Sequence, residues 1–75
     1  MKVRIVAKTP LGEFVTIPQE ATEVQFQNLQ KFIETVAASG SYMNMDVMGA
    51  NGRVDSVYLA SDVIKNSIFI LQTEE

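Results

Sequence analysis

Polar and apolar residues alternate in two runs at the start of the chain, residues 2–9 and residues 13–17. A period of two with one apolar face is typical of a half-buried strand. Pro10 and Gly12 lie between the runs and suit a tight connection. Pro18 ends the second run, because proline has no N–H to donate to a neighbouring strand. The pattern therefore predicts a β-hairpin.

The next segment has a helical period. Thr22 is a suitable N-cap, and Gln25, three residues later, completes a capping box. Gly40 can adopt the left-handed conformation that often ends a helix. Between these signals, apolar residues recur every three or four positions and form one stripe of an amphipathic helix. The stripe consists of Phe26, Leu29, Phe32, Ile33, Val36 and Ala37.

The second half of the chain returns to a period of two. Residues 42–48 and residues 53–60 both alternate, and the Asn51-Gly52 pair between them is a strong hairpin signal. Residues 61–66 then predict one helical turn or a crossover. A final strand at residues 67–73 is apolar on both faces. Such a strand is either central and covered twice, or half covered by another chain.

The order of these elements predicts an α+β fold, in which a single helix packs on a four- or five-stranded, mostly antiparallel sheet. We expect one domain over residues 1–75, because this length is at the small end of what folds alone. The chain has no cysteine, so disulfides and thiolate-bound metals cannot stabilise the small core. Good packing and self-association remain as means of stabilisation.

Composition also removes several kinds of chemistry. The chain contains neither His nor Cys, which excludes Ser-His and Cys-His catalysis and most zinc or copper sites. A formal net charge of -3 at pH 7 does not attract nucleic acid. No run approaches the roughly 20 apolar residues of a membrane span, and the start of the chain does not resemble a signal peptide. We expect a cytoplasmic protein that is not an enzyme and carries no cofactor.

Three methionines raise the question of a soft-metal site. Met43, Met45 and Met48 have a spacing found in thioether sites for Cu(I). In a strand, however, Met43 and Met45 share one face and Met48 lies on the other, and neither His nor Cys supports them. Methionine more often fills irregular gaps in cores or adaptable binding surfaces. We therefore interpret these residues as packing residues.

Oxygen donors surround the second hairpin, at Asp46, Asn51 and Asp55. A calcium-binding loop needs acidic or amide residues at alternate positions, a central glycine and a terminal glutamate, and this segment lacks that pattern. Asn51 suits the positive φ of a tight turn, and the two aspartates suit a solvated strand face. We expect no metal site.

The apolar residues exceed what one helix can cover, because a helix covers only one face of a sheet. We expect one set beneath the helix, namely Val3, Ile5, Met43, Met45, Val57 and Leu59. A second set would then form an exposed patch of the type that marks an interaction surface. This predicted interface consists of Val6, Tyr42, Met48, Tyr58 and, depending on the register of the last strand, Phe69. The alternative is a sheet that curls and buries both faces within one chain.

Basic residues provide a second hypothesis. Lys2, Arg4 and Lys8 share one face of the first strand and, with Arg53, could contact phosphates. The stripe has no interleaved aromatic residues, and pairing with acidic neighbours is the alternative interpretation. Those neighbours are Glu13, Glu74 and Glu75.

The opening "MKVRIVAKTPLGEFVTI" and the closing "LASDVIKNSIFIL" resemble the corresponding parts of the β-grasp (ubiquitin-like) fold, over nearly the whole chain. The resemblance implies that the first and last strands pair in parallel. Ubiquitin-type carriers end in Gly-Gly, whereas this chain ends in "QTEE", so the resemblance implies at most an adaptor without conjugation. The short chain without Cys or His also resembles small accessory proteins of phages and prophages.

Together these observations predict a non-catalytic protein–protein interaction module. We expect a small accessory or structural protein of phage type that associates with itself, with an unidentified protein, or with both. If it is phage-encoded, the compartment is the host cytoplasm. The alternatives are a nucleic-acid-associated protein that uses the basic face and a ubiquitin-like adaptor.

Overall fold

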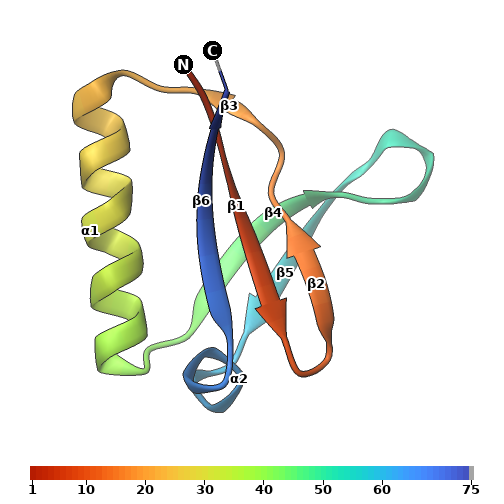
Figure 1. Ribbon diagram of the computed structural model, residues 1–75. Coiled ribbons are helices and arrows are strands. Elements are labelled where there is room, and N and C mark those ends of the chain that lie inside the picture. The colour runs from red at the N-terminus through yellow and green to blue at the C-terminus, as the bar shows by residue number, and fades with distance from the viewer. Residues whose placement is uncertain (75) are drawn as a thin grey trace.

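The computed structural model describes residues 1–74, and it confirms the α+β class (Figure 1). One long helix and several antiparallel strands surround a shared core. The elements are β1 (Lys2–Thr9), β2 (Gly12–Val15), β3 (Gln19–Glu20), α1 (Glu23–Ser39), β4 (Met43–Met48), the 3-10 turn η1 (Ala50–Gly52), β5 (Val54–Leu59), α2 (Ser61–Lys65) and β6 (Ile68–Glu74).

The strands form two sheets rather than one. β1 lies at the centre of the first sheet, where it pairs with β2, β3 and β6, and β4 and β5 form the second sheet. β1 and β6 are antiparallel, so the two termini lie side by side (Figure 1). This direction differs from the parallel pairing that the β-grasp resemblance implies.

The second strand of the first hairpin is interrupted by a bulge, which separates β2 from β3. Between the pairings of β1 with β2 and with β3, two residues of β1 stand opposite residues 16–18. At this bulge the Ile5 N–H donates to the Thr16 hydroxyl at 2.7 Å, and the Thr16 N–H donates to the Ile5 carbonyl at 2.9 Å. The Ile17 N–H then donates to the Asp46 carbonyl of β4 at 3.1 Å. The bulge therefore joins the two sheets.

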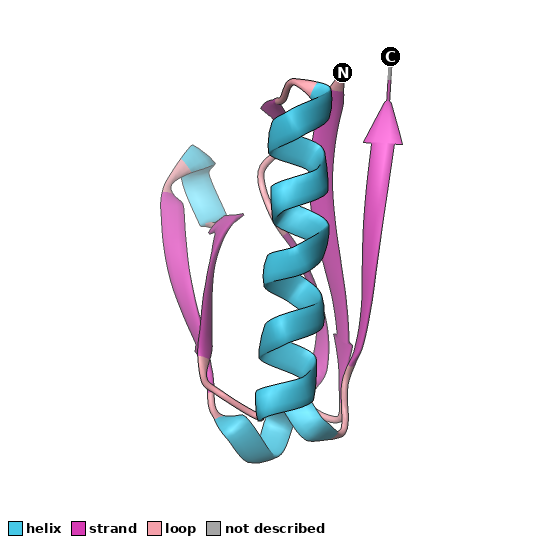
Figure 2. Cartoon of the chain, turned by 90° about the vertical axis from the view of Figure 1, so that its left-hand side faces the viewer, coloured by secondary structure: helices cyan, strands magenta, loops and turns pink. Residues whose placement is uncertain are grey.

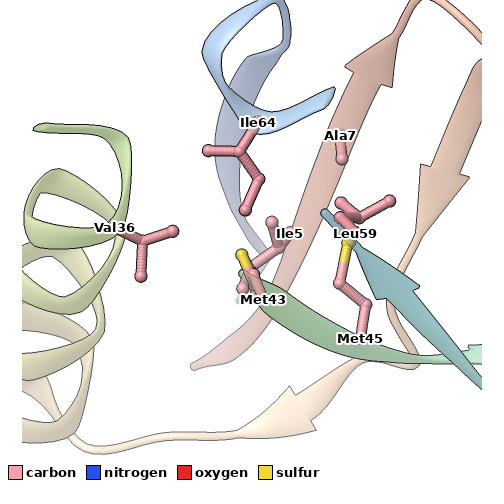
Figure 3. Close-up of a cluster of buried hydrophobic side chains, with 7 residues drawn as sticks. All are labelled: Ile5, Ala7, Val36, Met43, Met45, Leu59 and Ile64. Atoms are coloured by element: carbon pink, nitrogen blue, oxygen red, sulfur yellow. The ribbon is translucent and has the colours of Figure 1, made fainter. Parts of the chain in front are cut away.

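The core lies between the two sheets, and α1 closes one side of it. Figure 2 shows α1 with β4 and β5 on one side and β1 and β6 on the other. Side chains from β1, α1, β4, β5 and α2 meet in the cluster of Figure 3, which contains Ile5, Ala7, Val36, Met43, Met45, Leu59 and Ile64. The expected core is thus confirmed at its centre, while Val57 is half-buried at its margin.

The local signals for the helix and the second hairpin are also confirmed. The Thr22 hydroxyl accepts from the Gln25 N–H at 3.2 Å, and the Gln25 side chain accepts from the Thr22 N–H at 2.9 Å. Gly40 ends α1 with φ 68°, and Asn51 has φ 60° in the turn between β4 and β5. Phe32 departs from the expected buried stripe, since about half of it is exposed.

Candidate protein–protein interface

The β4–β5 hairpin has one face in the core and one face toward solvent. Alternation along each strand places Met43 and Met45 of β4 and Leu59 of β5 in the core, so their neighbours point outward. The register then sets Asn44 opposite Tyr58 on the outward side. We call this side the outer face, and it consists of Tyr42, Asn44, Asp46, Met48, Val54, Ser56 and Tyr58.

The outer face carries large apolar side chains at both ends. Tyr42 and Tyr58 are 73% and 71% exposed at one end, and the directly opposed pair Met48 and Val54 is 61% and 59% exposed at the other. Between them the Ser56 hydroxyl donates to the Asp46 carboxylate at 3.0 Å. Aromatic and methionine side chains are enriched in protein–protein interfaces, so this face is the candidate interaction surface of the hairpin.

Three of the five predicted interface residues, Tyr42, Met48 and Tyr58, therefore share the outer face and are exposed. The expectation for Val6 is wrong, because only 4% of this residue is exposed. It lies on the first sheet, not on the hairpin, and its cross-strand neighbours Val15 and Ile70 flank it on both sides.

The expectation for Phe69 is also wrong. Phe69 stands opposite Ala7 in the register of β1 and β6, so it points inward and packs against the core. The register turns Ile68 outward instead, and 65% of that residue is exposed. The sequence interpretation also missed Val54, although the alternation of residues 53–60 places it on the same face as Tyr58.

The methionines of β4 point to opposite faces of the hairpin, as the packing interpretation expects. Met43 and Met45 are 3% and 2% exposed in the core, whereas Met48 points to the outer face. Around the turn, the Asp55 carboxylate lies 4.0 Å from Arg53. Within residues 1–74, no three His, Cys, Asp or Glu side chains gather closely enough to hold a metal ion.

The basic residues of β1 lie on the outward side of the first sheet among acidic and polar partners. Lys8 stands opposite Glu13, and Lys2 stands opposite both Glu20 and Glu74. Glu75, another expected partner, lies outside the described residues. Acidic residues therefore face both lysines across the strands, as the pairing interpretation expects.

Arg4 shares the face of Lys2 and Lys8 on β1, whereas Arg53 lies apart from them. The Arg4 Nε donates to the side-chain carbonyl of Gln72 at 2.8 Å. Arg53 belongs to the turn region before β5, in the other sheet. Three of the four predicted phosphate-contacting residues, Lys2, Arg4 and Lys8, therefore share one face of β1, and Arg53 does not belong to that face.

Two findings complete the description of the site. Among the helices of residues 1–74, none is both long and apolar enough to cross a membrane. Comparison with models of protein families, with curated proteins and with solved structures finds no match to this chain.

Proposed function

We propose that this protein is a non-catalytic interaction module that associates with a second copy of itself through the β4–β5 hairpin. The observation that carries the proposal is the group of exposed apolar side chains on the outer face, Tyr42, Met48, Val54 and Tyr58. They are held on a paired, core-packed hairpin, so their positions are fixed before a partner arrives. Binding then orders little additional chain.

The size of the exposed groups supports the proposal energetically. A tyrosine side chain buries about 150–250 Å² when it is fully covered, and Tyr58 is 71% exposed. Covering roughly 100 Å² of it would contribute about 2.5 kcal/mol at 25 cal/mol per Å². Two copies would present this face twice in a symmetric dimer, because a two-fold interface uses the same surface patch on both chains.

The absence of His and Cys from the sequence supports a binding role over acid–base or nucleophilic catalysis. The proposal includes the expected setting, a small accessory protein of phage type in the cytoplasm. A chain without cysteine needs no oxidising compartment for its stability, which is compatible with that location.

The test is the solution mass, measured by size exclusion with light scattering over a wide range of concentrations. We expect a dimer, and we expect Tyr58→Asp to raise its Kd roughly thirty-fold or more, because a charge replaces a large exposed ring of the outer face. Ile68→Asp is the matched control, since Ile68 is equally exposed on a strand of the other sheet. A monomer at every concentration, or equal weakening by both variants, would contradict the proposal.

A further inference from the structure

The free edge of β5 has a defined hydrogen-bonding pattern. The Gly49 N–H donates to the Arg53 carbonyl at 2.7 Å, immediately before β5 begins. Hydrogen-bonded and non-hydrogen-bonded pairs alternate along an antiparallel ladder, so the odd-numbered residues of β5 bond to β4. The Asp46 carbonyl agrees with this pattern, because it points away from β5 and accepts from Ile17.

The even-numbered residues of β5 consequently turn their N–H and C=O groups away from β4. Within residues 1–74, no further strand pairs with β5 and no turn or loop hydrogen bond reaches these groups. A row of unpaired backbone N–H and C=O groups at the edge of a sheet can pair with a strand of another chain. The groups belong to Val54, Ser56 and Tyr58, whose side chains also lie on the outer face.

We propose that β5 pairs antiparallel with β5 of a second copy, about a two-fold axis at Ser56. This inference rests on the proposed self-association and specifies its geometry. Ser56 stands opposite Ser56 of the second copy, and Val54 of each chain stands opposite Tyr58 of the other. These three rows all use outward-pointing backbone groups, so they form about six hydrogen bonds between the chains.

The neighbouring registers are less favourable. A two-fold axis at Asp55 or at Val57 leaves two hydrogen-bonded rows within β5, with about four bonds. The axis at Asp55 also sets two carboxylates directly opposite each other, and like charges in that position are destabilising. The axis at Val57 separates Val54 from Tyr58 and places Asp55 opposite Leu59.

The Ser56 register, in contrast, gives the exposed apolar side chains of the outer face suitable neighbours. Both Val54–Tyr58 pairs join a β-branched residue to an aromatic residue, a combination that stabilises antiparallel strands. On the inner side, Asp55 stands opposite Val57 of the second copy, while its carboxylate remains 4.0 Å from Arg53 of its own chain. The result is a four-stranded sheet whose outer face joins the apolar groups of both copies.

The other free edge, β6, does not offer the same match. Ile5 bonds to Thr16, so Leu71 opposite Ile5 turns its backbone groups to the free edge. Two-fold pairing about Leu71 would set the exposed Ile68 opposite Glu74. The exposed apolar side chain of β6 would then face a carboxylate, whereas in the β5 pairing the exposed Val54 and Tyr58 face each other.

Because the chain has no cysteine, one introduced thiol tests the axis directly. In Ser56→Cys the two Cα atoms across a hydrogen-bonded row would be about 5.5 Å apart. That separation lies within the range of a disulfide, about 4.4–6.8 Å. The control is Asn44→Cys, on the same outer face but one strand further from the axis, where about three strand spacings of 4.8 Å, together with an offset of four residues along the strands, separate the thiols.

Under mild oxidation, we expect Ser56→Cys to form a disulfide-linked dimer at least ten times faster than Asn44→Cys. Circular dichroism establishes that both variants are folded. Ser56→Pro provides an independent test. The Ser56 N–H faces the free edge, so proline there removes the central donor without removing a β4–β5 hydrogen bond. We expect its dimer Kd to rise at least tenfold, with Ser56→Ala as the control that keeps the N–H.

The outcomes separate this inference from the proposed function. Preferential linking at position 56, together with weakening by proline, supports the two-fold axis at Ser56. A dimer in which Ser56→Cys links no faster than Asn44→Cys, or in which proline leaves the Kd unchanged, overturns the axis while self-association stands. A wild-type chain that remains monomeric over the whole concentration range overturns both.

Discussion

Thr16 follows β2, at the bulge where the chain contacts both sheets. Thr16 bonds to Ile5 of β1, and the next residue, Ile17, bonds to Asp46 of β4. The Thr16 hydroxyl accepts the Ile5 N–H at 2.7 Å, in place of the backbone carbonyl that an uninterrupted ladder would supply. Thr16→Val keeps the branched shape of the side chain and replaces the hydroxyl with a methyl group. The N–H of the buried Ile5 would then have no acceptor in this position.

The expected loss can be estimated from that single donor. Leaving a buried donor unsatisfied costs about 1–3 kcal/mol. A chain of 75 residues has a free energy of unfolding of roughly 4–11 kcal/mol, at about 0.05–0.15 kcal/mol per residue. A loss of about 2 kcal/mol is therefore a large fraction of the total, and it would lower Tm by roughly 8–16 °C in a domain of this size.

The measurement is urea unfolding followed by far-UV circular dichroism, at one fixed protein concentration because dimerisation adds to apparent stability. Thr16→Ser is the control, since it keeps the acceptor and removes only the methyl group, at about 1 kcal/mol or less. We expect a lower midpoint for Thr16→Val with an unchanged m-value. If Thr16→Val is no less stable than Thr16→Ser, the hydroxyl does not stabilise the bulge and the reasoning is refuted.

Two further predictions concern the helix and the methionines. Thr22→Ala should lower the free energy of unfolding by about 1 kcal/mol through loss of the N-cap, whereas Thr22→Ser should stay within about 0.5 kcal/mol of the wild type, as thermal unfolding can show. Met45→Ala should cost about 2–5 kcal/mol because it opens a cavity in the core. The exposed Met48→Ala should change monomer stability by about 0.5 kcal/mol or less, and similar losses in both variants would contradict the assignment of their faces.

The sequence by itself determined the features that depend on neighbouring residues. The capping box of Thr22 and Gln25 and the helix end at Gly40 involve contacts within a few residues, so local chemistry is sufficient to predict them. Alternation likewise separated the buried Met43 and Met45 from the exposed Met48, because successive side chains of a strand always point to opposite faces. The exposed tyrosines of the candidate interface followed from the same rule.

Only the tertiary structure decided how these faces are combined. The bulge at residues 16–18 divides the strands between two sheets, so Val6 and Tyr58 no longer share a surface. The register of β6 turns Phe69 toward the core and Ile68 toward solvent, which the doubly apolar sequence leaves open. Both outcomes depend on pairing between segments far apart in the chain. A period of two establishes that faces alternate, but strand pairing establishes which face meets the core.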